Sequence, residues 1–275
     1  MNLKILSNEV QQFINENLAS DIHKILLKKS PFSEVTSKEL VEQIESKSKS
    51  KHKLPTWFAA KNIFYPNKIN LSQTSSEVAA HYKSSLVQGK TLIDITAGLG
   101  IDSFAFSKNI NKIIHIEKNE ELSAIAEHNF VQLEATKIEC ISADGIYFLK
   151  NNSQTFDWIY LDPSRRDKNN NKVYYLSDCE PDVNEHLNFL FTKSNNILIK
   201  TGPLLDLNNG LKQLRSVKEI HIVAIGNDVK EVLWLLEKNY SEEPLIKTIN
   251  FKNENKQTFD FYLNQERSAI STYSI

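Results

Sequence analysis

Acidic side chains stand at or just after the ends of four apolar runs, and two closely spaced glycines follow the first of these acids. Those glycines, Gly98 and Gly100, fall within three residues although the whole chain has only 7. Glycine is used where the backbone turns tightly or approaches a ligand closely. Carboxylates only accept hydrogen bonds, so they suit hydroxyl and amino groups of a ligand. The acids are Asp94, Glu117, Asp144 and Asp162.

The spacing excludes two common phosphate-binding motifs. A dinucleotide fingerprint needs a third glycine three residues after Gly100, and that position is Ser103. A Walker loop needs Gly-Lys-Ser/Thr after the turn, and this sequence is absent. The segment 91–102 therefore predicts a nucleotide-binding strand–turn–helix of another kind, although a plain left-handed turn at a strand–helix junction stays open.

The segment resembles motif I of the class I S-adenosylmethionine-dependent methyltransferases. There the glycines let the backbone approach the methionine part of the cofactor, and a polar strand end meets its ammonium group. The resemblance implies that Glu117 accepts both ribose hydroxyls and that Asp144 bonds the adenine amino group. A single acid at a strand end can also be an ordinary polar residue that ends the strand and binds no ligand. The residues expected to bind the cofactor are Asp94, Thr96, Gly98, Gly100, Asp102, Glu117, Lys118, Asp144 and Gly145.

The fourth apolar run leads into Asp162-Pro163-Ser164-Arg165-Arg166. This segment resembles motif IV of the amino methyltransferases, Asp/Asn-Pro-Pro-aromatic, in which the acid and the first proline's carbonyl hold a substrate amine. The resemblance implies a catalytic group of Asp162, Pro163 and Ser164. Ser164 replaces the second proline and arginine replaces the aromatic residue.

Arg165 and Arg166 suit a phosphate or carboxylate, because guanidinium groups bind such anions in a bidentate manner. A structural ion pair with Asp167 or Asp178 is the alternative. The polar loop that follows either closes over a substrate or is a solvated connection.

The segment Gln73-Thr-Ser75-Ser76-Glu77 is similar to the Thr-Pro-Glu element before motif I in the RNA cap guanine-N2 methyltransferases. There the element helps to close the cofactor pocket. We expect substrate contacts from Gln73, Ser75 and Ser76, together with Arg165, Arg166 and Lys200.

Together with Lys53-Leu-Pro-Thr-Trp57, these motifs look like a bacterial group of uncharacterised methyltransferases. That group has a helical N-terminal domain and usually a C-terminal THUMP-like domain. No such C-terminal domain is recognisable, so we expect a truncated or short version. THUMP domains bring RNA, so the resemblance implies methylation of a nitrogen of an RNA base. A protein side chain or small anionic acceptor, and a non-catalytic scaffold, are the alternatives.

Carbon-5 pyrimidine methylation is disfavoured because it needs a cysteine nucleophile near the end of the fourth or fifth strand. The fifth apolar run, 196–199, leads into Lys200-Thr201-Gly-Pro without one. Cys140 and Cys179 are too few for a disulfide framework or a thiolate zinc site, and we expect Cys179 in the core.

From residue 71 onward, predicted strands and helices alternate, which is typical of a mostly parallel sheet covered by helices. We predict an α/β, Rossmann-like, seven-stranded class I methyltransferase sheet with an antiparallel last strand. The predicted domains are a helical one at 1–70 and a methyltransferase domain at 71–275. Expected strands are 92–95, 112–116, 138–141, 157–161, 196–199, 220–225, 246–251 and 258–263, the last two antiparallel. Expected helices are 75–87, 101–109, 120–133, 145–150, 183–190, 207–214 and 229–238.

Residues 1–50 show helical spacing of apolar residues, with a short helix expected at 39–44. The basic run 45–53 predicts either a solvated helix end or linker, or a nucleic-acid contact. In the second case Trp57 and Phe58 could stack on a base.

The net charge of −1 gives no overall attraction to nucleic acid, and 40% hydrophobic residues are ordinary for a globular protein. The longest apolar runs are too short to span a bilayer, and the N-terminus lacks the apolar core of a signal peptide. We therefore expect a reduced, cytoplasmic protein with no membrane partner and no metal.

Overall fold

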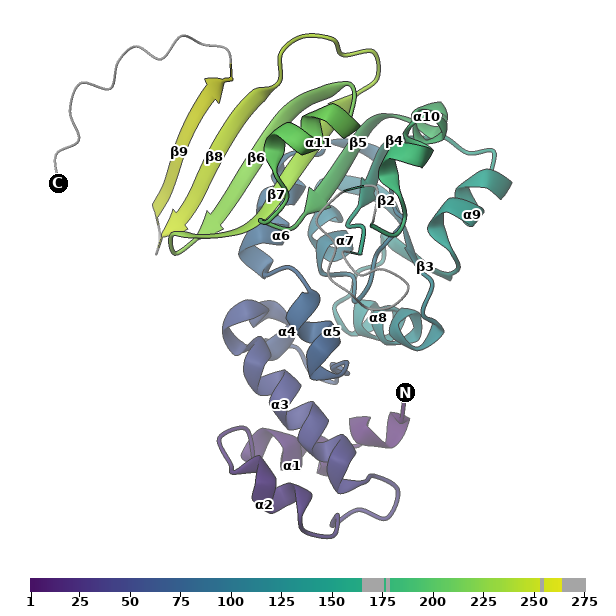
Figure 1. Cartoon of the computed structure of the whole chain (residues 1–275). Coiled ribbons are helices and arrows are strands. Elements are labelled where there is room, and N and C mark those ends of the chain that lie inside the picture. The colour runs from purple at the N-terminus through teal and green to yellow at the C-terminus, as the bar shows by residue number, and fades with distance from the viewer. Residues whose placement is uncertain (165–175, 177–178, 253–254, 264–275) are drawn as a thin grey trace, which may run out of the picture. The chain divides into compact units, whose positions relative to one another are not determined.

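The computed structural model describes residues 1–164, 176, 179–252 and 255–263, and Figure 1 shows its elements in chain order. Arg165 and Arg166 lie outside these described residues. The chain divides into two structural units, residues 1–157 and 158–275. The boundary falls within one strand, β4 (Phe156–Leu161).

The first unit begins with helices. They are η1 (Leu3–Leu6), α1 (Asn8–Glu16), α2 (Ile22–Leu26), α3 (Ser37–Lys53), α4 (Pro55–Ala59) and α5 (Lys68–Gln73). Thr36 starts α3 through a capping box with Glu39, in which each side chain accepts from the other residue's backbone N–H. Pro55 stands at the first position of α4, where a missing N–H costs nothing.

The Lys-rich run belongs to α3, so the expectation of a short helix at 39–44 was wrong. The helix continues to Lys53, and one of its faces is covered because Ser46 and Ser50 are fully buried. Lys53 Nζ donates to the carbonyl oxygen of Leu71 at 2.9 Å. Small serine side chains let this face pack closely. In the sequence, the lysines around these serines make the segment look solvated.

The N-terminal helices share one hydrophobic core with α7 (Ile101–Phe106) and α8 (Glu120–Gln132). Trp57 is only 1% exposed, and its ring meets those of Phe104 and Phe130 edge-on at 6.1 and 6.4 Å. The Asn129 side chain accepts from Phe64 N at 2.8 Å and donates to Phe64 O at 2.9 Å. Trp57 is therefore a core residue, and the expectation that it could stack on a base was wrong.

The rest of the first unit alternates strands and helices as predicted. It contains α6 (Glu77–Ser85), β1 (Gly89–Asp94), β2 (Ile110–Glu117), β3 (Ile138–Ser142) and α9 (Gly145–Asn151), besides α7 and α8. The strand order is β3-β2-β1, all parallel, with Asp94 beside His115 and Glu117 beside Ser142. The carboxyl ends of the strands therefore meet at one edge, where parallel α/β sheets bind ligands.

The second unit holds α10 (Val183–Lys193), β5 (Ser194–Thr201), α11 (Leu207–Gln213), β6 (Val217–Ile225), β7 (Asp228–Glu237), β8 (Leu245–Lys252) and β9 (Asn255–Tyr262). The strand order is β5-β7-β6-β8-β9, with β7 antiparallel to both neighbours and β8 antiparallel to β9. In Figure 1, β8 is the yellow-green strand beside β6, and β9 is the yellow strand at the edge, beside β8. The described residues form nine strands in the α/β class expected, two more than the predicted seven-stranded sheet and one more than the eight strand segments expected from the sequence.

The predicted helix at 229–238 is wrong, because this segment is the strand β7. Six consecutive residues, 231–236, are buried in this strand between β5 and β6, and the last five of them, 232–236, are apolar. A strand covered on both faces is a continuous apolar run, and periodicity does not distinguish it from a short buried helix.

Candidate active site

The two glycines of the turn after β1 have different roles. Gly100 has φ +83°, and a Cβ there would lie 2.2 Å from Phe130 Cζ, so both backbone and packing demand glycine. Gly98 has φ +57°, and a Cβ there would meet nothing within 4 Å. Gly100 therefore closes the turn onto the core, whereas Gly98 borders open space.

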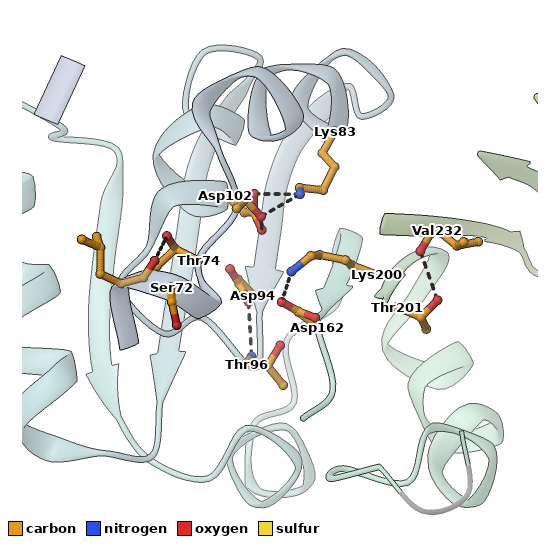
Figure 2. Close-up of polar contacts among 12 residues, drawn as sticks. Ser72, Thr74, Lys83, Asp94, Thr96, Asp102, Asp162, Lys200, Thr201 and Val232 are labelled. Carbon is orange, nitrogen blue, oxygen red and sulfur yellow. Dashed lines mark hydrogen bonds and ion pairs between the residues drawn. The ribbon is translucent and has the colours of Figure 1, made fainter. Parts of the chain in front are cut away.

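Asp94 holds the turn in shape. Its carboxylate is 1% exposed and accepts from Thr96 N at 3.2 Å and from Ser103 Oγ at 2.7 Å. Figure 2 shows the Asp94–Thr96 contact. The Ser103 hydroxyl also lies 3.2 Å from His115 Nδ1. A glycine at position 103 could make neither contact, so the departure from the dinucleotide motif has a structural purpose.

His115 lies in β2, beside Asp94 of β1, and its imidazole stays neutral. It is fully buried, and burial lowers its pKa to about 3, against a weaker opposing effect of the Gly98 backbone. Its ring meets Phe130 edge-on at 5.3 Å. The Ser103 hydroxyl has one proton, which it donates to Asp94. Its oxygen can therefore only accept a hydrogen bond from His115, so Nδ1 carries the proton of the neutral His115 ring.

Glu117 and Asp144 lie at the ends of β2 and β3. Glu117 accepts from Gly98 N at 2.9 Å and from Asn119 N at 2.7 Å. Asp144 caps α9 by accepting from Tyr147 N at 2.8 Å and is exposed. A carboxylate has about four acceptor positions, so these bonds fix each group and leave acceptor capacity for a ligand.

The two remaining predicted cofactor residues at this edge differ from each other. A Cβ at Gly145 would lie 2.3 Å from the carbonyl oxygen of Ile95, so glycine lets this loop pack against the end of β1. Lys118 is exposed.

A buried lysine that the motifs did not indicate joins two predicted site residues. Lys83 Nζ lies 3.1 Å from Asp102 Oδ1 and donates to Ser75 Oγ at 2.9 Å. Ser75 in turn donates to Asp102 Oδ2 at 2.9 Å. Figure 2 shows the ammonium of Lys83 directed at Asp102. The cluster ties the segment before α6 to the first turn of α7, and no feature of the sequence indicated it.

The other residues of the segment before α6 are dispersed. Ser76 caps α6 by accepting from Ala79 N at 3.3 Å, and Gln73 is exposed at the end of α5. Glu77 is buried and accepts from the backbone N–H and the hydroxyl of Thr56 at 2.7 and 2.9 Å. This glutamate thus fixes the start of α4.

In the second unit, Asp162 directly follows β4 and pairs with Lys200 of β5, whose ammonium donates to Asp162 Oδ2. Figure 2 shows this pair. Pro163 is buried, and the exposed Ser164 exchanges backbone hydrogen bonds of 2.8 and 3.1 Å with Glu180. Cys179 is buried, as expected.

The end of β5 is fixed by residues of α11 and β7, which follow it in the chain. Trp234 Nε1 donates to Thr201 Oγ1 at 3.0 Å, and the Thr201 hydroxyl donates to the carbonyl oxygen of Val232 at 3.3 Å. A Cβ at Gly210 would lie 2.3 Å from the Trp234 ring. Lys200 therefore stands on a strand end that packing and hydrogen bonds hold in place.

Within the described part of the chain, no group of three or more His, Cys, Asp or Glu side chains could hold a metal ion. In the same residues, no helix has the length and apolar character needed to cross a membrane.

Comparisons with known proteins agree with this arrangement. The family model described as "Conserved hypothetical protein 95" matches residues 72–182. A putative methyltransferase from Porphyromonas gingivalis W83 has a similar structure, with 30% identity and a TM-score of 0.84. That match covers 98% of this chain and 68% of the other. Ribosomal RNA small subunit methyltransferase J from Francisella tularensis subsp. novicida (strain U112) is 25% identical over 105 residues. The match covers 35% of this chain and only 44% of that relative's length.

The strand order, the glycine turn and the structural similarity over nearly the whole chain all indicate the same class of protein. The chain belongs to the class I S-adenosylmethionine-dependent methyltransferases.

The residues at the ends of β1, β2 and β3 fit the cofactor of this class, S-adenosylmethionine. Gly98 borders open space, where the absence of a side chain admits a ligand close to the backbone. Glu117 offers two oxygens to two vicinal hydroxyls, as a ribose presents them. When bound, the cofactor supplies an activated methyl group on a positively charged sulfur.

Proposed function

We propose that this protein methylates a nitrogen of an RNA base with S-adenosylmethionine. The observation that carries the proposal is Asp162, a partly exposed carboxylate placed at the end of β4 and followed by Pro163. A carboxylate and a backbone carbonyl both accept hydrogen bonds, so together they can orient an amino group. Catalysis of methyl transfer is then mostly positioning of a nucleophile beside an activated methyl group.

The roles proposed for the first unit concern the cofactor. Glu117 accepts the ribose hydroxyls and Asp144 accepts from the adenine amino group. Gly98 provides close approach of the backbone. Further cofactor contacts are proposed for Thr96 and Lys118. The required backbone conformation around the cofactor is kept by Asp94, Gly100, Asp102 and Gly145.

The roles proposed for the second unit concern the methyl acceptor. Asp162 and the carbonyl of Pro163 accept hydrogen bonds from the amine and direct its lone pair, and Ser164 completes the loop. Arg165 and Arg166 would bind phosphate. The proton that the nitrogen loses after transfer passes to Asp162 or to water.

Charge in the N-terminal region supports RNA as the substrate. Residues 1–70 contain eleven lysines and seven acidic residues, although the whole chain has a net charge of −1. Lys49 and Lys51 are exposed on the C-terminal half of α3. Local positive charge of this kind attracts the phosphate backbone. The curated relatives that match the chain are named as ribosomal RNA methyltransferases.

The remaining proposals concern organisation. We propose that residues 1–70 form a helical N-terminal domain whose apolar side chains join the core of a methyltransferase domain at 71–275. We also propose that the protein acts in the cytoplasm. In the first unit, we propose substrate contacts for Gln73 and Ser76, whereas the buried Ser75 acts through its contacts with Lys83 and Asp102. In the second unit, we propose a substrate contact for Lys200.

The experiment supplies tritiated S-adenosylmethionine with total RNA, or with lysate protein, from a strain that lacks the gene. We expect label in RNA. Asp162→Ala should lower transfer by about 100-fold or more, since it removes an oriented acceptor, and leave cofactor affinity in calorimetry unchanged. Asp228→Ala, which removes an exposed partner of Lys230, is the matched control. Label found only in protein would refute the RNA assignment, and an equal loss of cofactor binding would show that Asp162 is misassigned.

A further inference from the structure

The short helix α5 depends on side chains at both of its ends. It has 6 residues, and a helix this short is marginal unless its end groups find partners. Asn67 caps its start. At its other end, Lys53 Nζ donates to the carbonyl oxygens of Leu71 and Ser72 at 2.9 and 3.0 Å. An ammonium in this place satisfies carbonyls of the last turn and also opposes the negative end of the helix dipole.

The same lysine fixes the turn that follows α5. The carbonyl oxygen of Leu71 also accepts from Thr74 Oγ1 at 2.9 Å, so Lys53 and Thr74 meet at one acceptor. Figure 2 shows Thr74 of this turn. The next residue is the buried Ser75, which donates to Asp102 Oδ2 at 2.9 Å. The backbone that Lys53 holds therefore leads directly to the hydroxyl that contacts α7.

The far end of the segment 71–77 is anchored to the same group of helices. Glu77, the first residue of α6, is 8% exposed, and its two carboxylate oxygens accept from the backbone N–H and the hydroxyl of Thr56 in α4. The segment is thus fixed at both ends by the N-terminal helices and in its middle by Asp102. A loop held at three points is preorganised, so a ligand that binds against it orders it at little entropic cost.

The middle contact adjoins the glycine turn. Asp102 lies in the first turn of α7, which begins directly after Gly100. The following residue, Ser103, donates to the carboxylate at the end of β1 at 2.7 Å. Gly98, in the same turn, borders open space. A displacement of Ser75 would therefore move the helix start that shapes the turn.

We propose that Lys53 is a positioning residue for the binding of S-adenosylmethionine. It keeps the segment after α5 in the conformation in which Ser75 holds the start of α7, and it thereby keeps the glycine turn ready for the cofactor. The inference goes beyond the proposed function, because it needs only the cofactor of this class and holds for any methyl acceptor. It gives the N-terminal helices, which do not carry the glycine turn, a part in cofactor binding.

The alternative is a purely local role, in which Lys53 stabilises α5 and nothing else. In that case Lys53→Met would lower the unfolding free energy but leave cofactor binding by the folded protein unchanged. Stability alone therefore does not distinguish the two roles, whereas cofactor affinity does.

The experiment measures the affinity of the full-length protein for S-adenosylmethionine by calorimetry, with circular dichroism to verify that each variant is folded. Lys53→Met keeps a long side chain and removes the ammonium, so we expect the dissociation constant to rise about 5- to 20-fold. Lys53→Arg keeps charged donors and should stay within about threefold of the unaltered protein. Lys38→Met, the control, removes an exposed lysine of the same helix and should leave the affinity unchanged.

A double-variant cycle tests the path through Ser75. Ser75→Ala removes the hydroxyl that bonds Asp102 and should weaken cofactor binding at least as much as Lys53→Met does. If Lys53 acts through this hydroxyl, the double variant should bind within about twofold of Ser75→Ala alone, since residues that act through one another are not additive. With any acceptor that the protein methylates, Lys53→Met should raise KM for the cofactor and leave kcat within about twofold.

The outcomes separate this inference from the proposed function. Unchanged cofactor affinity of folded Lys53→Met, an arginine variant as weak as the methionine variant, or independent effects of Lys53→Met and Ser75→Ala would each overturn the inference. None of these results bears on RNA as the methyl acceptor, and a failure to label RNA leaves the inference standing. If Lys53→Met does not fold, Lys53→Gln, which keeps a neutral donor, replaces it in the cycle under the same criteria.

Discussion

Replacing Lys83 by methionine should destabilise the first unit strongly. The ammonium is fully buried, lies 3.1 Å from Asp102 Oδ1 and donates to Ser75 Oγ. Methionine fills a similar volume, so the main change is that Asp102 loses its positive partner. The Asp102 side chain is 11% exposed, so water compensates this charge only in small part.

The expected magnitude follows from burial. Removing one partner of a buried ion pair typically costs about 3–5 kcal/mol of unfolding free energy. The small exposure of Asp102 and its remaining bond from Ser75 place the expectation near the lower end, about 3 kcal/mol. For a chain of this size, that corresponds to a fall of the thermal midpoint by about 6–12 °C.

The assay is thermal and denaturant unfolding followed by circular dichroism. Lys112→Met is the matched control, because its pair with Glu139 lies in the same unit at a similar distance of 3.0 Å but with both side chains 54% exposed. Such exposed pairs contribute about 0–1 kcal/mol. The double variant Lys83→Met/Asp102→Asn should regain at least about 1 kcal/mol of unfolding free energy over the single variant. The reason is that it also removes the carboxylate charge of Asp102, which has lost its ammonium partner.

Two results would refute this reasoning. A cost of Lys83→Met no greater than that of the Lys112→Met control would mean that Asp102 is not left uncompensated. A double variant less stable than Lys83→Met alone would mean that the charge of Asp102 is satisfied by other groups.

The glycines and one acidic residue give the remaining predictions. Gly100→Ala, whose Cβ would lie 2.2 Å from Phe130 Cζ, should cost about 2–4 kcal/mol of unfolding free energy through strain and overpacking. Gly98→Ala should cost only about 1–2 kcal/mol, because its Cβ enters open space, but should weaken S-adenosylmethionine binding in calorimetry; equal stabilities of the two variants would contradict this. The hydrogen bond from His221 lowers the pKa of Glu219 from 4.5 to about 2 against opposing burial, so stability present above pH 4.5 should be lost as the pH falls towards 2. Glu219→Gln should flatten the fall in thermal midpoint between pH 5 and 3, and an unchanged slope would exclude this group as its cause.

The strand–turn–helix that carries the proposed cofactor site could be predicted from the sequence because its signals are local. A strand, two glycines and a helix are contiguous, and each acid falls at a strand end that apolar runs mark. The same holds for Asp162 after β4, where even the departures from the known motif are visible residue by residue.

The errors concern residues whose environment comes from distant parts of the chain. The segment 228–237 is a strand only because β5 and β6 flank it, and its apolar run alone favours helix equally well. Trp57 is covered by Phe104 and Phe130, which follow it by more than forty residues. Lys83 and Asp102 are an ion pair only because two helices pack together, and neither residue type indicates this in isolation.

The core shared by the N-terminal helices and α7–α8 limits how this enzyme can be re-engineered. Trp57, Phe64 and Ile5 belong to the same buried cluster as Leu99 and Ile101, which lie in and directly after the glycine turn. Helices grafted from another methyltransferase would have to reproduce this interface atom for atom, or leave apolar surface open beneath the turn. Residues 1–70 are therefore not an exchangeable module, and variation there is coupled to the geometry of the glycine turn.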